Sequence, residues 1–367
     1  MTALVPLLTA LTIVAPQDGA SVPTHRPGQK AYLASARTER FVRMDNPADR
    51  AKLLRMGATQ QPLRLAWTGD ETNVVYLLDI VREGGDEQTF AVSNRTEVWL
   101  TNLEVGSRFR WMVRQAGTLE SASASFVTED VAPRLLRADG VRNFRDLGGW
   151  RTTDGKRVRE NMIFRSAGLR ASSKSSGGFL RRKVEMGERR VTDEGIDTLN
   201  EDFRIRTDLE LRTPQETAGM VGSALGKDVR WENISFGAYE FIGNSLRGRE
   251  PFAKIFRLFV KEENYPILMH CSGGRDRTGT LAFLLNGLLG VSEDDLCRDW
   301  ETSVFSDAGM KFTSSRIQGL VDYLKTMPGD TMKERIEAYV RSCGITAEEI
   351  ASFRAIMLRG TEAADGP

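Results

Sequence analysis

The chain has 367 residues, enough for two domains of ordinary size. Lys and Arg total 51 against 50 for Asp and Glu, and this near-neutral balance argues against a broad basic surface for nucleic acid or a membrane. The three cysteines form no disulfide framework, and the two histidines, His25 and His270, are too few for a His-rich zinc site. We expect neither a metal nor a cofactor.

The apolar residues 3–14 have no Lys or Arg before them, whereas a secretory signal starts with a basic segment. The stretch is also too short to cross a bilayer. We interpret it as a first β-strand that ends in the turn-like residues 16–19. On this interpretation any natural export signal is missing from the sequence.

The first third of the chain has the pattern of short β-strands. Residues 63–67 alternate apolar and polar side chains, and further strands are expected at 74–81, 109–113 and 121–128. One set of residues is spaced as in a fibronectin type III or related immunoglobulin-like domain, which this region resembles: Trp67, Leu103, Gly106, Phe109, Trp111 and Phe126. The resemblance implies a β-sandwich. Such a domain favours export to the periplasm or the cell exterior.

After residues 129–133, which we interpret as a linker, the pattern changes to α/β. Residues 204–211 are a strand candidate, and the short apolar run at 267–269 predicts another strand. Helices are expected at 278–289, after Ser292 as an N-cap, and at 332–343 and 347–357. The predicted fold is therefore multidomain, with a β-sandwich over residues 1–132 followed by an α/β domain over residues 133–367.

The segment HCSGGRDRTG, residues 270–279, carries the strongest chemical signal because it lies between a short apolar strand and an apolar helix. Its glycines allow successive backbone N–H groups to turn towards one centre as an anion nest, and the helix N-terminus adds positive potential. Such surroundings favour a reactive thiolate at Cys271. Arg277 can bind two phosphate oxygens at once, and the Thr278 hydroxyl is expected to donate to the Cys271 sulfur. A lone cysteine is more often a core residue, which is our interpretation of Cys297 and Cys343.

This segment resembles the signature loop of protein tyrosine phosphatases, and in particular the HCxxGKDRTG loop of an atypical bacterial branch. Residues 143–149 (NFRDLGG), 163–169, 208–212 and 299–303 resemble further motifs of that branch, so the resemblance covers about residues 138–357. It implies an α/β cysteine-dependent phosphatase domain with Cys271 as the nucleophile and Arg277 as the phosphate clamp. The implied phosphate cradle consists of Ser272, Gly273, Gly274, Arg275, Asp276 and Arg277.

The resemblance also assigns roles to neighbouring residues. Asp276 is implied as the general acid, the alternative being a structural carboxylate that orients Arg277 or caps the loop. Supporting roles fall to five residues: His270, Thr278, Asn143, Arg145 and Asp146. The chain departs from the branch at Arg275, where the branch often has Lys. It also has about 20 extra residues between Leu169 and Val191, including Arg181, Arg182, Lys183, Arg189 and Arg190. These form either a basic rim over the site or a solvated charged segment.

The sequence thus predicts hydrolysis of phosphomonoesters through a phosphocysteine intermediate, by a protein tyrosine or dual-specificity phosphatase. The alternatives are a phosphoinositide or inositol phosphate phosphatase, an arsenate reductase, and a phosphate-binding module without turnover. The expected partner is a phosphorylated protein or a small phosphate ester, with no nucleic acid and no membrane except through a lipid substrate. Because every chemical motif follows residue 142, a chain starting near Pro133 is expected to fold and remain active.

Overall fold

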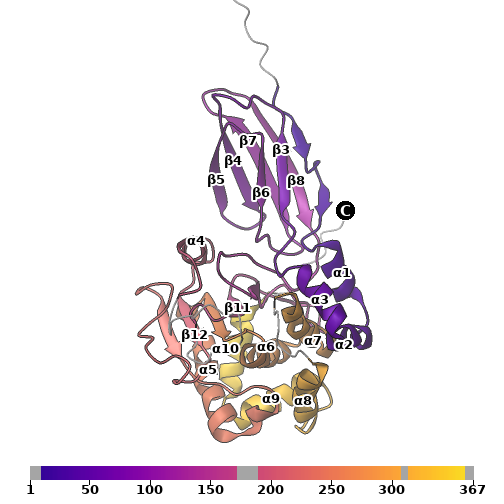
Figure 1. Cartoon of the computed structure of the whole chain (residues 1–367), viewed down its shortest axis with the longest axis vertical. Helices are drawn as coiled ribbons and strands as arrows, with labels where there is room; N and C mark the ends of the chain where they lie inside the picture. Colours follow the sequence, from indigo (N-terminus) through magenta and orange to yellow (C-terminus); the bar gives the residue numbers. More distant parts are fainter. Residues whose placement is uncertain (1–9, 172–188, 307–312, 360–367) are drawn as a thin grey trace, which may run out of the picture. The chain divides into compact units, whose positions relative to one another are not determined.

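The computed structural model describes residues 10–171, 189–306 and 313–359, and its contacts divide the chain into two compact units (Figure 1). The first, called the β unit below, comprises Met1–Arg26 and Gln60–Arg134. The second, called the α/β unit, comprises Pro27–Thr59 and Leu135–Pro367. The predicted boundary at residue 132 is therefore wrong for residues 27–59, which pack with the α/β unit although they precede most of the β unit in the chain.

Two sheets make up the β unit, and their buried side chains form one hydrophobic core that includes Trp67, Trp111 and Phe126. A sheet of three strands has the order β1-β3-β6, and a sheet of five has the order β2-β8-β7-β4-β5. The strands are β1 (Ile13–Ala15), β2 (Ala20–Val22), β3 (Leu63–Trp67), β4 (Val75–Arg82), β5 (Glu87–Ser93), β6 (Glu97–Leu100), β7 (Arg108–Gln115) and β8 (Ser121–Thr128).

The strand pattern of the sequence is reproduced at β3, β4, β7 and β8. The first strand begins only at Ile13, and residues 3–9 of the predicted strand lie outside the described residues. Strand β5 was not predicted because it is an edge strand with nearly every side chain exposed, so it carries no apolar alternation.

Three short helices that the sequence analysis missed precede most of the β unit in the chain: α1 (Pro27–Ala34), α2 (Arg37–Asp45) and α3 (Pro47–Arg55). Each buries only one or two apolar side chains, which gives a weak periodic signal, although α3 has a recognisable N-terminus. The Asn46 side chain accepts hydrogen bonds from the N–H groups of Ala48 and Asp49, and Pro47 occupies the first helical position.

Charged pairs attach α2 to the rest of the α/β unit. The fully buried Arg40 Nε lies 2.7 Å from Oε2 of Glu301, which is also fully buried, and its Nη2 lies 2.6 Å from Oδ1 of Asp294. Arg37 pairs with Glu293 at 2.7 Å. All three acids belong to α7 (Glu293–Glu301), so α2 is fixed along that helix.

Replacing Arg40 with Met is therefore expected to lower the free energy of unfolding of the α/β unit by about 3–5 kcal/mol, because Glu301 would remain buried without its partner. Urea denaturation measures the loss. The control is Arg64→Met, which breaks an exposed pair of similar length, 2.6 Å to Glu97, and should cost less than about 1 kcal/mol. A chain that starts near Pro133 lacks Arg40 and should be destabilised in the same way. Equal losses in the two Met variants would contradict the anchoring role of α2.

The α/β unit contains a sheet of five strands in the order β13-β12-β14-β11-β9, parallel except for β9. The central strand β14 (Ile267–Cys271) is entirely buried and is followed by α6 (Asp276–Leu289), which packs against β14 and β11. The other strands of this sheet are β9 (Arg145–Asp146), β11 (Ile163–Ala167), β12 (Thr207–Glu210) and β13 (Arg230–Asn233). The unit also contains β10 (Arg157–Val158) and β15 (Leu358–Arg359).

The helices predicted after Ser292, at 332–343 and at 347–357 are present, and α7 begins after its N-cap Ser292. The α-helices at 193–197, 250–259 and 314–325 were not predicted. Helix α6 begins at Asp276, two residues before the predicted start. The other α-helices are α4 (Asp193–Asp197), α5 (Glu250–Phe259), α8 (Ser314–Lys325), α9 (Met332–Ser342) and α10 (Ala347–Met357). Shorter 3-10 or π turns occupy Thr198–Asp202, Tyr239–Gly243, Ser245–Arg249, Glu262–Asn264 and Thr302–Phe305.

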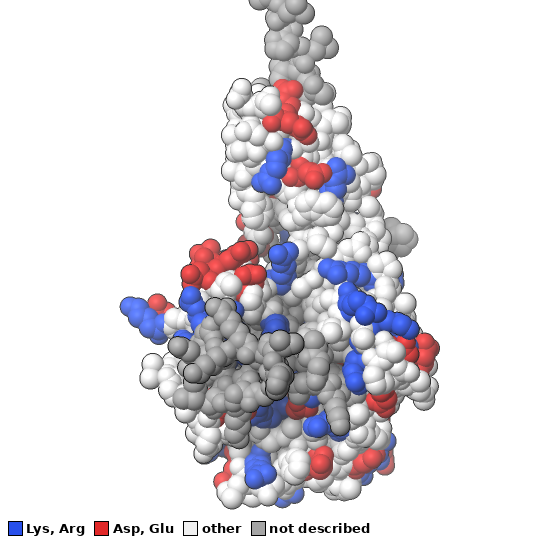
Figure 2. Space-filling view, in the orientation of Figure 1, with Lys and Arg blue, Asp and Glu red and all other residues white. Residues whose placement is uncertain are grey.

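Acidic and basic side chains are interspersed over the face shown in Figure 2, as the near-neutral net charge suggests. Within the described ranges, no helix has the length and apolar character needed to cross a membrane.

Candidate active site

The signature loop joins the carboxyl end of the central strand to the first turn of α6. Cys271 is the last residue of β14 and is buried, and α6 begins at Asp276. Gly274 has a φ of +70°, and a Cβ atom there would lie 2.3 Å from the carbonyl oxygen of Ser166. The loop therefore requires glycine at this position both for its backbone conformation and for its close approach to β11.

Two buried side chains bind the outer face of the loop. The Asn143 Nδ2 donates to the Gly273 carbonyl oxygen at 3.0 Å, and the Arg165 Nη2 donates to that of Gly274 at 2.7 Å. Since the C=O and N–H of one peptide group point in opposite directions, the N–H groups of Gly274 and Arg275 are turned away from these donors. This is the orientation that an inward-facing anion nest needs.

Asp299 of α7 organises the residues that bind the loop. Its Oδ1 accepts a hydrogen bond from Arg145 Nε at 2.8 Å, and its Oδ2 binds Arg165. Burial raises the pKa of Asp299, but the charges of Arg145 and Arg165 outweigh burial and lower it, so the carboxylate is ionised. Asp299 and Arg165 lie in the segments 299–303 and 163–169 that resemble family motifs, but no role was predicted for either. The signal for Arg165 was a charged residue within an otherwise apolar strand.

The predicted supporting residues at 143–146 have different contacts. Asn143 and Arg145 act on the loop, whereas Asp146 binds backbone. Arg145 donates to the Asn143 Oδ1 at 2.5 Å and so holds the amide that binds the loop. Asp146 accepts hydrogen bonds from the N–H groups of Gly148 and Asn161, both at 2.8 Å. Asp146 therefore stabilises the backbone of the segment that leads into β11.

Arg277 is held by Glu216, which the sequence analysis missed. Its Nη1 and Nη2 bind Oε2 and Oε1 of Glu216 at 2.7 and 3.0 Å, and Nη2 also reaches the Ser272 hydroxyl at 3.2 Å. A guanidinium has five N–H donors, so these three bonds leave two for a phosphate. Burial raises the pKa of Glu216, but hydrogen bonds from Arg277 and Thr213 lower it to about 2. The only signal in the sequence was an acid four residues after the 208–212 motif.

His270 lies between two carboxylates of β12. Its Nε2 is 2.6 Å from Oδ1 of Asp208, and its Nδ1 is 3.4 Å from Oε2 of Glu210. Burial lowers the pKa of His270, but the charges of Glu210 and Asp208 outweigh burial and raise it. The two carboxylates thus favour the protonated imidazolium, which joins the loop-bearing strand β14 to β12.

This arrangement predicts a loss of stability at alkaline pH. A histidine with a raised pKa contributes stability that is complete below its ordinary pKa of 6.5 and is lost as pH rises through the raised value. We expect the free energy of unfolding of the α/β unit, from urea denaturation at a series of pH values, to decline above neutrality. His270→Gln should flatten this decline, whereas the control His25→Gln in the β unit should not. An unchanged slope in His270→Gln would contradict the ion pair.

Thr278 does not act as expected. Its Oγ1 is buried and makes no hydrogen bond to any described residue, so it does not donate to the Cys271 sulfur. Because α6 already begins at Asp276, the helical backbone sets the direction of this side chain.

Asp276 pairs with Arg275 and not with Arg277, in contrast to the structural alternative considered from the sequence. Arg275 is buried, and its Nε and Nη2 donate to the two carboxylate oxygens at 3.1 and 3.0 Å. The Tyr239 hydroxyl donates to Oδ1 of the same carboxylate. Tyr239 itself has a φ of +55°, a conformation that is rare for a bulky residue.

The other two cysteines have different surroundings from Cys271. Burial raises the pKa of the Cys297 thiol to about 12 and that of Cys343 to about 11. Both are therefore poor nucleophiles at neutral pH. Of the basic insertion, Arg181, Arg182 and Lys183 lie outside the described residues, while Arg189 pairs with Asp193 at 2.5 Å.

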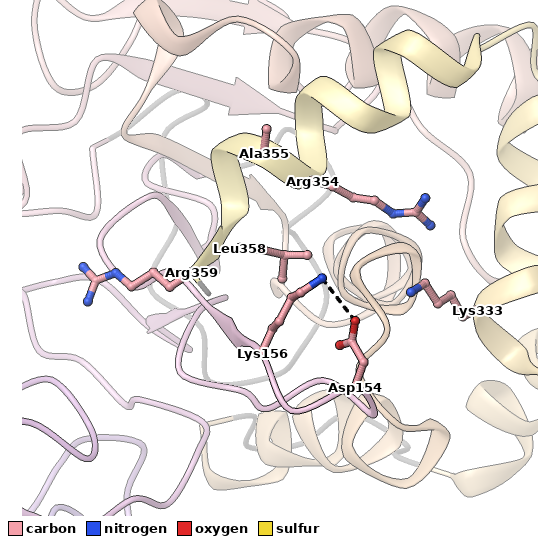
Figure 3. Close-up of a pocket in the computed structure, with 7 residues that line it drawn as sticks. All are labelled: Asp154, Lys156, Lys333, Arg354, Ala355, Leu358 and Arg359. Carbon is pink, nitrogen blue, oxygen red and sulfur yellow. Dashed lines mark ion pairs between the residues drawn. The ribbon is translucent and has the colours of Figure 1, made fainter. Parts of the chain in front are cut away.

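A pocket lies at the other end of α6 and is lined by Asp154, Lys156, Lys333, Arg354, Ala355, Leu358 and Arg359 (Figure 3). Arg354 donates to the carbonyl oxygen of Leu288, near the end of the helix, whereas the signature loop is at its start. A helix of this length spans about 20 Å, so the pocket is remote from Cys271. Lys156 is paired with Asp154 at 3.3 Å, and Arg354 with Glu337 at 2.7 Å.

Three features together define a cysteine-dependent phosphatase. They are a buried thiol at the end of a central parallel strand, a loop oriented as an anion nest, and an arginine fixed beside that loop. A sequence model described as "Tyrosine phosphatase family" matches residues 136–188 and 176–359, which is more than half of the chain. The chain belongs to the tyrosine phosphatase family.

Two curated proteins are similar to this chain. A Cupriavidus necator protein named as a tyrosine-protein phosphatase is 28% identical over 205 residues, covering 50% of this chain and 69% of the relative. A tyrosine-protein phosphatase of Nostoc commune is 25% identical over 165 residues, covering 39% of this chain and 53% of the relative.

Two solved structures also align with this chain. One is the core catalytic domain of the PP-IP phosphatase Siw14 from S. cerevisiae with citrate, at 20% identity and a TM-score of 0.27, covering 44% of this chain and 80% of that one. The other is a Siw14 catalytic core, at 15% identity and a TM-score of 0.30, covering 55% and 93%.

Proposed function

We propose that this protein hydrolyses phosphomonoesters of proteins, as a tyrosine or dual-specificity phosphatase, through a phosphocysteine at Cys271. The observation that carries the proposal is the fixed loop around Cys271. Its outer carbonyl groups are bound by Asn143 and Arg165, and Arg277 is held beside it by Glu216. Binding of a phosphorylated protein as partner follows from this activity.

The reaction has two steps. The Cys271 thiolate attacks phosphorus, an S–P bond forms, and the ester P–O bond breaks with its electron pair on the leaving oxygen. A water molecule then attacks phosphorus, the S–P bond breaks, and the thiolate and inorganic phosphate are released. The loop N–H groups and Arg277 bind the equatorial oxygens in both steps.

Asp276 is proposed as the group that protonates the leaving oxygen. Glu216, which binds Arg277 beside the loop, has its pKa lowered to about 2 and is ionised at neutral pH. Asp276 belongs to the loop itself and is partly exposed, so it is within reach of solvent and substrate. Arg275 and Tyr239 fix its position.

Asp276→Asn keeps the shape of the side chain and removes the proton. We expect it to slow the hydrolysis of alkyl phosphates by about 100-fold and of esters with good leaving groups far less. The measurement is the dependence of kcat/KM on leaving-group pKa in both proteins. Parallel dependences would assign Asp276 a structural role and place the acid elsewhere.

The β unit is proposed to be an immunoglobulin or fibronectin III-like β-sandwich. Its sheets of three and five strands share one core of alternating side chains, which supports this assignment. We propose residues 1–26 and 60–134 as its extent, in place of 1–132.

The direct test is release of phosphate from p-nitrophenyl phosphate, with the phosphorylated enzyme detected by mass spectrometry after an acid quench. Binding of phosphate without turnover would establish a silent binding module. Reduction of arsenate would require a second reactive thiol, and the raised pKa of the buried Cys297 disfavours it in that role. A panel of phosphotyrosine, phosphoserine, phosphoinositide and inositol phosphate substrates distinguishes the phosphatase alternatives.

A further inference from the structure

An exposed arginine on a helix that is distant in sequence lies beside the signature loop. Arg316 is in the first turn of α8, and its Nη1 is 3.9 Å from Oδ1 of Asp276. Its guanidinium also lies over the ring of Tyr239, 5.9 Å from the ring centre. Both contacts place its positive charge next to Asp276, the first residue of α6.

Neither contact uses the hydrogen-bonding capacity of Arg316. The Asp276 carboxylate already accepts hydrogen bonds from Arg275 and Tyr239, and 3.9 Å is too long for another. Among the described residues, no hydrogen bond from the Arg316 guanidinium is found. A planar group with five donors is therefore presented beside the loop with its charge only loosely compensated.

The exposed fractions of the Arg275, Arg277 and Arg316 side chains indicate which of them lie inside the site and which lies at its edge. The side chain of Arg275 is 1% exposed, that of Arg277 is 19% exposed, and that of Arg316 is 51% exposed. Arg275 and Arg277 thus belong to the interior of the site, and Arg316 belongs to its rim.

The first turn of α8 is held in place by α2. The Ser314 N–H and hydroxyl donate to Oδ1 and Oδ2 of Asp45 at 2.7 and 2.6 Å. Arg37 of α2 reaches Gln318, one turn further along α8, at 3.3 Å. Because its helix is anchored at this end, the backbone of Arg316 is preorganised for binding.

We propose that Arg316 binds an acidic side chain that flanks the phosphorylated residue of a peptide substrate. When the phosphorylated side chain enters the loop, the neighbouring residues of a peptide stay at the rim, where Arg316 is exposed. A guanidinium with unused donors recognises a carboxylate through charge and paired hydrogen bonds. The inference rests on the proposed phosphatase function and narrows its substrate class to acidic phosphopeptides.

The test uses two phosphotyrosine peptides that differ only in having Glu or Gln on both sides of the phosphotyrosine. The wild-type kcat/KM should be about two- to fivefold higher for the Glu peptide, as for an exposed ion pair. The ratio should fall to about one in Arg316→Gln and be partly kept in Arg316→Lys. It should also shrink in 1 M salt, where the screening length is about 3 Å.

Lys325→Gln is the matched control, because Lys325 lies on the same helix, is 45% exposed and is also 3.9 Å from an acid, Glu293. It should keep the wild-type ratio. The proposal is overturned if wild type shows no preference, or if Arg316→Gln keeps it. A further comparison uses a small bisphosphate and a monophosphate as substrates. The proposal is also overturned if Arg316→Gln changes the preference between these two substrates but not the preference between the two peptides.

Failure of the proposed function would look different. In that case wild type would release phosphate from neither peptide nor from p-nitrophenyl phosphate. The role of Arg316 would then be decided by binding of the same two peptides to Cys271→Ser, with and without Arg316→Gln, measured by calorimetry. A difference between the peptides that depends on Arg316 supports the role, and equal binding overturns it.

Discussion

Replacing Cys271 with serine is expected to lower the turnover of p-nitrophenyl phosphate by more than about 1,000-fold, because the covalent route through sulfur is lost. A serine hydroxyl holds its proton far more tightly than a thiol and is a weak nucleophile without an adjacent base. The loop itself should survive, since its contacts are made by the carbonyl groups of Gly273 and Gly274 and not by the sulfur.

Inorganic phosphate should therefore still bind to Cys271→Ser, and calorimetry measures this binding. Cys343→Ser is the control for loss of a thiol, since Cys343 is remote from the loop in the sequence and donates to the carbonyl oxygen of Tyr339. It should keep wild-type turnover. Turnover by Cys271→Ser above a few per cent of wild type would assign the nucleophile elsewhere.

Replacing Arg277 with lysine should lower kcat for the same ester by about 100- to 1,000-fold, the usual cost of losing a donor to transition-state charge. Lysine keeps the positive charge but has no planar fork, so it cannot bind Glu216 through two nitrogens and still present donors to phosphate. The loss should appear in kcat as well as in KM, since the contacts strengthen as charge develops on the phosphoryl oxygens.

Arg298→Lys is the control, because Arg298 is similarly exposed, at 21%, and also pairs with an acid, Asp294, at 2.5 Å. It should keep most of the activity. If Arg277→Lys raised only KM, Arg277 would bind substrate and transition state equally, and its assignment as a clamp on the reacting phosphoryl group would be wrong.

The sequence by itself determined the chemistry of the loop, because that chemistry is local. Cys271, the glycines and Arg277 lie within seven consecutive residues between a strand and a helix, and such a loop has few ways to fold. Periodicity also predicted β14 and the helices α6, α7, α9 and α10, since each has a strongly apolar stretch or a clear cap.

Only the tertiary structure decided which residues hold that loop in place. Glu216 meets Arg277 across 61 residues of sequence, and Arg165 meets Asp299 across 134. Local patterns carry no information on such pairs, because a buried charge is stable only where the fold supplies its partner.

The same reason explains the error at residues 27–59. Each of their helices buries only one or two apolar side chains, and charged contacts, such as Arg40 with Glu301 across 261 residues, add to their attachment. A pattern of hydrophobic spacing cannot assign such a segment to its unit, since the partner charges are known only once the whole chain has folded.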